Sequence, residues 1–168
     1  DAVDFASECW FLTGPTAAGK TRVALELARQ LDAEIVSLDS MAVYRDMDIG
    51  TAKPSPAQRD RIPHHLLDIR NPDEEFSVAD YMTAATQVIG EIRSRNREVL
   101  FVGGTPMYLK AMLRGIYRGP PADWEFRQQV REEAEQVGPA ALHERLEQVD
   151  PLTAARLHPN DTRRIIRA

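Results

Sequence analysis

The sequence predicts an α/β fold, an open parallel sheet flanked by helices, with a helical insertion after the third predicted strand. Two observations carry this prediction. Short apolar runs without polar alternation recur in the first two thirds of the chain, which is typical of strands buried on both faces of a parallel sheet. Stretches with helical periodicity lie between these runs, and this alternation favours right-handed crossover connections.

Size and composition fit such a domain. The chain has 168 residues, of which 43% are hydrophobic and 28% charged, so it can form a packed core and is not of the disordered class. The single cysteine, Cys9, cannot form an intramolecular disulfide. No apolar run is long enough for a spanning helix. We therefore expect a soluble cytoplasmic protein without a membrane partner. We also expect a monomer, on no separate signal in the sequence.

Three short runs are the candidate strands. The run 9–13 ends at Gly14, and a helical pattern with Val23, Leu27 and Leu31 at a spacing of four follows it. The second and third runs are residues 35–38 and 99–102. Each of the three runs is followed by glycine or small polar residues, so each predicted strand ends at a turn.

A long helix is expected between the second and third strands. Ser77 and Asp80 form a capping box at its start. An apolar stripe along one face follows and would pack on the sheet; its members are Val78, Met82, Ala85, Ile89 and Ile92.

The character of the chain changes at Gly119-Pro120-Pro121. Beyond it we find only helical signals, opening at Asp123, at Pro139 and at Asp150-Pro151. We therefore divide the chain into an α/β core, residues 1–118, and a helical segment, residues 119–168. The net charge is −5, which argues against a nucleic-acid partner, but the last eighteen residues are locally basic.

A phosphate-binding loop joins the first strand to the first helix. The pattern G-x-x-x-x-G-K-[ST] is matched in full by Gly14, Pro15, Thr16, Ala17, Ala18, Gly19, Lys20 and Thr21. Backbone N–H groups and the helix N-terminus would hold a diphosphate or triphosphate, Lys20 adds positive charge, and the Thr21 hydroxyl can bind Mg²⁺. The fold is therefore expected to be P-loop NTPase-like, but the loop does not identify the compound.

Two further strand ends lie at the same predicted edge. Ligands of open parallel sheets bind outside the carboxyl ends of the strands. Asp39 would place a carboxylate there, to accept a proton or to hold Mg²⁺ through water, and Thr105 would present a hydroxyl after Gly103-Gly104. The alternatives are a helix N-cap at Asp39 and a plain tight turn at Gly103-Gly104.

Five motifs, in order, resemble the tRNA dimethylallyltransferases (tRNA isopentenyltransferases). They are GPTAAGKT, DSMAVYRDMDIGTAKPS, PHHLLDI, VGGTPMYLKAML and HPNDTRRIIRA. The resemblance implies transfer of a dimethylallyl group from dimethylallyl diphosphate to the N6 amine of the adenine beside the tRNA anticodon, with Mg²⁺ as cofactor. It also implies that the chain is the front portion of a longer enzyme, with weak or no turnover in isolation.

The resemblance assigns roles to individual residues. Asp39 would take the proton from the amine, Thr105 would orient the amine and the diphosphate, and Thr16 to Thr21 would hold the diphosphate. The helical segment would grip the anticodon stem-loop. The expected tRNA contacts are Asp39, Ser40, Met41, Ala42, Thr105, Arg127, Arg163, Arg164, Ile165, Ile166 and Arg167. Solvated helix faces remain the alternative for Arg127 and for the arginines of residues 163–167.

Four positions depart from the family pattern. Ala42 replaces a frequent glutamine, so an amide contact to the base must be absent or come from elsewhere. Ala18 replaces a frequent serine. Pro106 and Met107 replace a common Gly-Leu, so we expect a shifted turn with the Thr105 hydroxyl retained.

His64-His65 with Asp68 also suggests a metal site, but adjacent strand residues point to opposite faces, so packing or hydrogen bonding is the favoured interpretation. Three other functions stay open: a P-loop small-molecule kinase with Asp39 as base, an adenylate isopentenyltransferase that accepts free AMP or ATP, and a protein that binds nucleotide or RNA without turnover.

Overall fold

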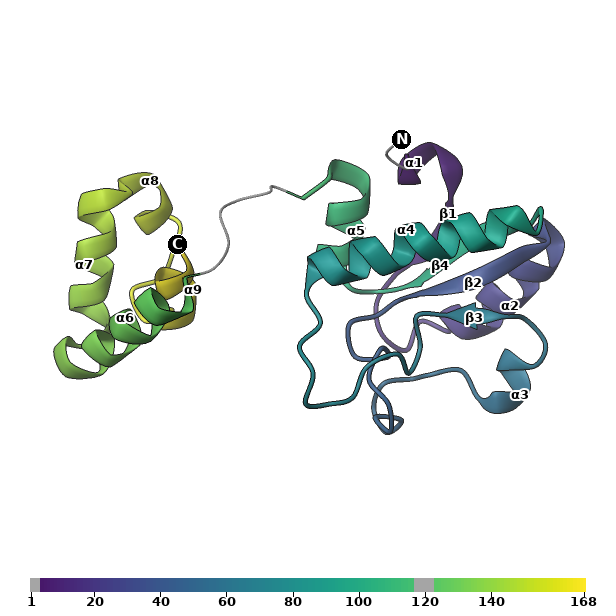
Figure 1. Cartoon of the computed structure of the whole chain (residues 1–168), viewed down its shortest axis with the longest axis horizontal. Helices are drawn as coiled ribbons and strands as arrows, with labels where there is room; N and C mark the ends of the chain where they lie inside the picture. The colour runs from purple at the N-terminus through teal and green to yellow at the C-terminus, as the bar shows by residue number, and fades with distance from the viewer. Residues whose placement is uncertain (1–3, 117–122) are drawn as a thin grey trace. The chain divides into compact units, whose positions relative to one another are not determined.

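The computed structural model describes residues 4–116 and 123–168 (Figure 1). The chain divides into two compact units, Asp1–Tyr117 and Arg118–Ala168. The junction predicted at Gly119-Pro120-Pro121 lies outside the described residues. Within the described ranges, no helix is both long enough and apolar enough to cross a membrane.

The first unit contains a four-stranded parallel sheet in the order β1-β4-β2-β3. This confirms the predicted open parallel sheet. All three predicted strands form, and the sequence analysis missed only the short fourth one. The strands are β1 (Trp10–Thr13), β2 (Ala33–Leu38), β3 (His64–His65) and β4 (Glu98–Gly103).

The register brings three strand ends to one edge. Thr13 and Leu38 both pair with Gly103, so the residues that follow each strand emerge side by side. A Cβ at Gly103 would lie 2.2 Å from the carbonyl oxygen of Leu38, so only glycine fits there. The close approach of β4 to β2 at this edge therefore depends on Gly103.

Helices cover both faces of the sheet (Figure 1). On one face α4 (Val78–Ser94) packs through Tyr81, Ile89 and Ile92 onto the inner residues of β2 and β4. The predicted capping box is confirmed, because Ser77 N donates to Asp80 Oδ2 at 2.9 Å and Asp80 N donates to Ser77 Oγ at 3.2 Å. The same face carries α1 (Phe5–Glu8) and α5 (Pro106–Arg114).

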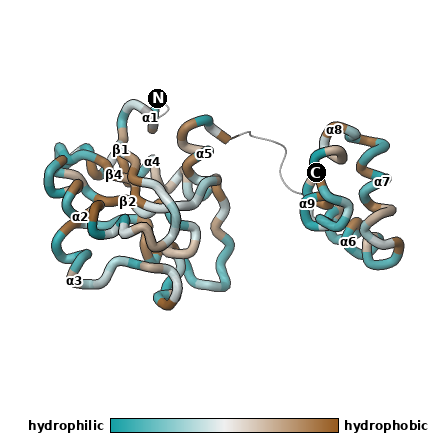
Figure 2. Tube along the Cα trace, turned by 180° about the vertical axis from the view of Figure 1, so that it is seen from behind, coloured by the Kyte–Doolittle hydropathy of each residue, from teal (hydrophilic) through white to brown (hydrophobic). Residues whose placement is uncertain are grey.

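The other face of the sheet is covered by α2 (Lys20–Leu31), which confirms the first predicted helix. Its fully buried residues are Ala24 and Ala28, whereas Val23 of the apolar stripe is 49% exposed. Small alanines let the helix approach the strands closely. Figure 2 shows hydrophobic segments along the strands, while the helices alternate between hydrophobic and hydrophilic residues.

The second unit is helical, as predicted. Asp123 caps the first helix by accepting a hydrogen bond from Phe126 N at 2.9 Å, and Pro139 and Pro151 each open a helix. The helix expected after Asp150 is short and ends at Ala154. The helices are α6 (Trp124–Val137), α7 (Pro139–Val149), α8 (Pro151–Ala154) and α9 (Thr162–Arg167). Their small core consists of Val130, Ala134, Leu142, Leu146, Ala154 and Ile165.

Candidate functional site

A cavity of about 560 Å³ opens at the carboxyl edge of the sheet. One wall is the P-loop, residues 16–21. A second wall is formed by residues 50–54, which belong to an irregular segment that we call the wall loop, residues 44–54. The floor is the α2 side of the sheet, where Ile35, Ser37 and His64 lie. The pocket thus combines phosphate-binding backbone with a partly apolar floor.

The P-loop has the geometry that its sequence pattern predicts. It begins directly after β1, and α2 begins at Lys20 after Gly19, whose φ of 76° is left-handed. The unpaired N–H groups of the first turn of α2 therefore belong to a wall of the pocket. Lys20 Nζ donates to the carbonyl oxygens of Gly14 at 2.9 Å and Pro15 at 2.7 Å. Gly14 and Pro15 support the loop from outside the pocket lining.

Asp39 and Thr105 both line the pocket. Asp39 Oδ1 accepts hydrogen bonds from Met41 N at 2.8 Å and from Ala42 N at 3.3 Å, which fixes the carboxylate. Ser40 N donates to Thr105 Oγ1 at 3.0 Å, so the ends of β2 and β4 are joined through the threonine hydroxyl. The structure therefore brings together the two residues expected to do the chemistry.

The residues that follow Asp39 and Thr105 include two of the positions that depart from the family pattern. Pro106 opens α5, a position that proline favours, and Thr105 directly precedes it with its hydroxyl retained at the pocket. Ala42 is 3% exposed and lines the pocket. Ser40 contributes its backbone N–H to Thr105, and its side chain does not line the cavity. Met41 is 44% exposed at the pocket.

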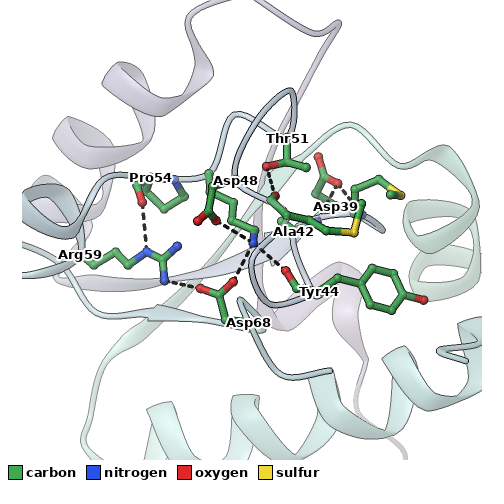
Figure 3. Close-up of polar contacts among 11 residues, drawn as sticks. Asp39, Ala42, Tyr44, Asp48, Thr51, Pro54, Arg59 and Asp68 are labelled. Carbon is green, nitrogen blue, oxygen red and sulfur yellow. Dashed lines mark hydrogen bonds and ion pairs between the residues drawn. The ribbon is translucent and has the colours of Figure 1, made fainter. Parts of the chain in front are cut away.

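Sequence reasoning missed a cluster of charges on the wall loop. Lys53 has a side chain only 3% exposed. Its ammonium is bonded to Tyr44, Asp48 and Asp68, which are labelled in Figure 3. Its Nζ donates to Tyr44 O at 2.6 Å, to Asp48 Oδ1 at 3.0 Å and to Asp68 Oδ1 at 2.7 Å. Arg59 Nη1 donates to the other oxygen of Asp68 at 2.6 Å. The sequence signal was the presence of Lys53 in the motif DSMAVYRDMDIGTAKPS, but no partner lies at a helical or strand spacing from it.

The charges of this cluster stabilise one another. Burial alone would raise the pKa of Asp68, but hydrogen bonds from Lys53 and Arg59 outweigh it and lower that pKa below its usual value. Burial would likewise lower the pKa of Lys53, and the bonds to Asp68 and Asp48 raise it instead. Both groups are therefore charged at neutral pH.

The two adjacent histidines point in different directions, as expected. His64 Nδ1 lies 2.7 Å from the carbonyl oxygen of Ile62, and His65 Nε2 lies 2.6 Å from Glu34 Oε2. Burial lowers the pKa of His64, so its ring is neutral at pH 7 and donates from Nδ1 to the carbonyl. Among the described residues, no group of three or more His, Cys, Asp or Glu is arranged to hold a metal ion.

The expected tRNA contacts of the helical unit differ in exposure. The guanidinium of Arg127 lies 5.2 Å from the ring centroid of Trp124. Arg163, Arg164 and Arg167 are exposed on α9, so their charges face solvent. Ile165, by contrast, is 5% exposed and packs in the core of this unit, with Ile166 partly buried beside that core. The Ile165 side chain could contact tRNA only if α9 moved away from this core.

Comparison with known proteins gives consistent relatives. The chain is 51% identical to a tRNA dimethylallyltransferase of Desulfotalea psychrophila, over 94% of the chain and 50% of the relative. It is 54% identical to one of Rhodopirellula baltica, over 94% and 49%. Among solved structures, it is 45% identical to a tRNA isopentenylpyrophosphate transferase of Bacillus halodurans, with a TM-score of 0.64 over 95% of the chain and 53% of that protein.

A solved eukaryotic dimethylallyltransferase acting on tRNA is 28% identical, with a TM-score of 0.78 over 95% of the chain and 40% of that protein. These neighbours have the P-loop NTPase-like fold predicted from the sequence. The chain spans about half the length of the curated relatives it matches. The family profile of IPP transferase matches residues 42–168, and the chain belongs to this family.

Proposed function

We propose that the protein transfers a dimethylallyl group from dimethylallyl diphosphate to the N6 amine of the adenine adjacent to the anticodon in tRNA. The observation that carries this proposal is the pocket in which P-loop residues 16–21, Asp39 and Thr105 line one cavity. The family and the names of the relatives support the same reaction. We place the protein in the cytoplasm, as a monomer.

The P-loop is suited to bind the diphosphate leaving group. In the transfer, the carbon–oxygen bond to the diphosphate breaks and its electron pair stays on the diphosphate, so negative charge develops there. Backbone N–H groups of residues 16–21 and the ammonium of Lys20 are suited to stabilise this charge. Among residues 4–116 and 123–168, the hydrogen-bond partners of Lys20 Nζ are the neutral carbonyl groups Gly14 O and Pro15 O, so its positive charge is available to the ligand.

The nucleophile explains Asp39. The adenine amine forms the new nitrogen–carbon bond and must release a proton, which the carboxylate of Asp39 accepts. The two backbone amides hold Oδ1, and no hydrogen bond to Oδ2 is found among the described residues, so Oδ2 is the oxygen that takes the proton. Thr105 Oγ1 accepts a hydrogen bond from the backbone N–H of Ser40, the neighbour of Asp39, and lines the same cavity, so it is placed to orient the amine.

Mg²⁺ fits the residues at the pocket. The Thr21 hydroxyl and the Asp39 carboxylate are hard oxygen donors on the same lining, and diphosphate oxygens would supply further ligands. Thr21 would hold the ion directly and Asp39 through water. Bound there, the ion would supply additional charge stabilisation to the diphosphate.

The helical unit supports tRNA as the acceptor. Arg163, Arg164 and Arg167 give α9 an exposed basic surface, and cationic side chains of this kind bind phosphates. An adenine in the anticodon loop is unpaired, so it can leave the stack and enter a pocket at the sheet edge. Neither a small-molecule kinase nor an adenylate isopentenyltransferase needs such a surface.

Labelled dimethylallyl diphosphate tests the proposal. The protein, at the full length that its gene encodes, is incubated with the labelled donor, Mg²⁺ and unmodified tRNA, and label is expected in the RNA at the adenine next to the anticodon. AMP is added to a parallel reaction. If AMP becomes labelled and added tRNA does not reduce this labelling, the protein is an adenylate isopentenyltransferase. Transfer of phosphate from ATP to a small molecule, without prenylated RNA, would refute the proposal in favour of a kinase.

A further inference from the structure

The wall loop, residues 44–54, is held by one buried ammonium group. Lys53 closes this loop on itself by donating to the carbonyl oxygen of Tyr44, nine residues earlier. It also joins the loop to the segment after β3 by its bond to Asp68. The backbone strengthens this junction, because Asp68 N donates to Ala42 O at 3.1 Å and Ile69 N donates to Val43 O at 2.8 Å.

The hydrogen bonds of Lys53 rule out a role as a phosphate ligand. An ammonium group has three N–H donors, and all three are used by Tyr44 O, Asp48 and Asp68. The charge is also compensated, since Lys53 and Arg59 face two carboxylates. Lys53 would have to break its ion pairs with Asp48 and Asp68 to reach a diphosphate. Lys53 therefore holds the pocket wall in place and does not bind the diphosphate.

The backbone conformation of the wall loop needs side-chain contacts that restrain it. Asp46 and Ala52 of this loop have left-handed backbone, with φ of 59° and 51°, and so does Asp68 in the adjoining segment after β3, with φ of 55°. Residues other than glycine adopt this conformation at an energetic cost and keep it only where the surrounding structure fixes them. Lys53 lies next to Ala52 and contacts Asp68 directly. One side chain therefore restrains the backbone at two of these positions.

We propose that Lys53 is a positioning residue. It holds residues 50–54, and through Asp68 the backbone at Ala42, in the places where they form the pocket wall for the adenine acceptor. This inference rests on the proposed function for the identity of the acceptor. It assigns the two pocket lysines different tasks: Lys20 binds the diphosphate, and Lys53 shapes the wall.

The variant Lys53→Met tests this division, because methionine keeps the side-chain length and removes the ammonium. Calorimetric titration with Mg²⁺ and pyrophosphate is expected to give a dissociation constant within about threefold of wild type, since the P-loop is intact. In contrast, kcat/KM for tRNA is expected to fall at least about 30-fold. Lys20→Met should show weakened pyrophosphate binding. Lys110→Met, at an exposed lysine on α5, should match wild type in both assays.

A second measurement separates positioning from general loss of stability. Hydrogen exchange in Lys53→Met is expected to rise in residues 44–54 while the P-loop and α6–α7 stay at wild-type rates. If this variant does not fold, Asp68→Asn weakens the same contact at its partly exposed carboxylate partner. It should likewise keep pyrophosphate affinity while kcat/KM for tRNA falls. Loss of pyrophosphate binding to the level of Lys20→Met, or wild-type exchange and turnover, would overturn the inference. A wild-type protein that transfers no prenyl group would refute the proposed function and leave the exchange result standing.

Discussion

The P-loop and the wall loop border the same pocket, but they are built on different principles. The P-loop uses backbone amides and a lysine whose partners are neutral carbonyl groups, so it keeps an uncompensated positive charge. The wall loop uses a lysine whose charge is cancelled by Asp48 and Asp68. One wall is therefore arranged to meet an anion, and the other is arranged to keep its shape. Charge compensation, more than the presence of a lysine, separates a binding residue from a scaffold residue.

The largest effect is expected at Asp39, the proposed base, which follows β2 and lines the same pocket as both loops. Asparagine keeps an Oδ1 acceptor for the amides of Met41 and Ala42 but cannot take a proton. Asp39→Asn should therefore lower kcat by about 10²- to 10⁴-fold, the usual contribution of a general base. Steady-state kinetics with tRNA measure this, and pyrophosphate binding by the same variant in EDTA serves as the control, because Asp39 is also proposed to hold Mg²⁺ through water. A kcat within threefold of wild type would assign proton removal to another group.

A smaller effect is expected on the P-loop at Thr21. Valine has nearly the same shape but no hydroxyl, so Thr21→Val removes the oxygen that we propose as a Mg²⁺ ligand. Pyrophosphate binding in the presence of Mg²⁺ should weaken about tenfold, which corresponds to about 1.4 kcal/mol. In EDTA, wild type and variant should bind pyrophosphate equally. A difference that persists in EDTA would mean that the hydroxyl contacts the diphosphate itself.

The sequence predicted the P-loop side of the pocket much better than the wall loop. Residues 14–21 form a contiguous pattern whose function depends on local backbone, and the strand ends at Asp39 and Thr105 follow from parallel-sheet register. Lys53 meets its partners across nine and fifteen residues of irregular chain. No periodicity encodes such contacts, because they depend on how the loop folds back. The same limit applies to α2, where close packing selected Ala24 and Ala28 over the larger Val23.

The ion pairs of the wall loop should make part of the stability depend on acid pH. The pKa of Asp68 is lowered in the folded protein, so its contribution is fully present above the unfolded value of about 3.8 and is lost as the pH falls through the lower folded value. Asp68→Asn should cost about 1–2 kcal/mol of unfolding free energy at pH 7. This difference from wild type should shrink below pH 3.8, as urea unfolding at several pH values would show. A constant difference across that range would contradict a charged Asp68.

The smallest effect is expected at Asp48, which contacts the same ammonium from the solvent side. Its side chain is 71% exposed, whereas that of Asp68 is 30% exposed. Water screens an exposed ion pair, so Asp48→Asn should change the unfolding free energy by less than about 0.5 kcal/mol. The asparagine still offers an oxygen to Lys53, and Asp68 and Tyr44 O keep the ammonium in place. Urea unfolding of Asp48→Asn beside Asp68→Asn therefore measures which carboxylate fastens the wall loop. Equal losses in the two variants would mean that the fastening is shared, and that compensation of charge, not burial of one pair, sets the shape of this wall.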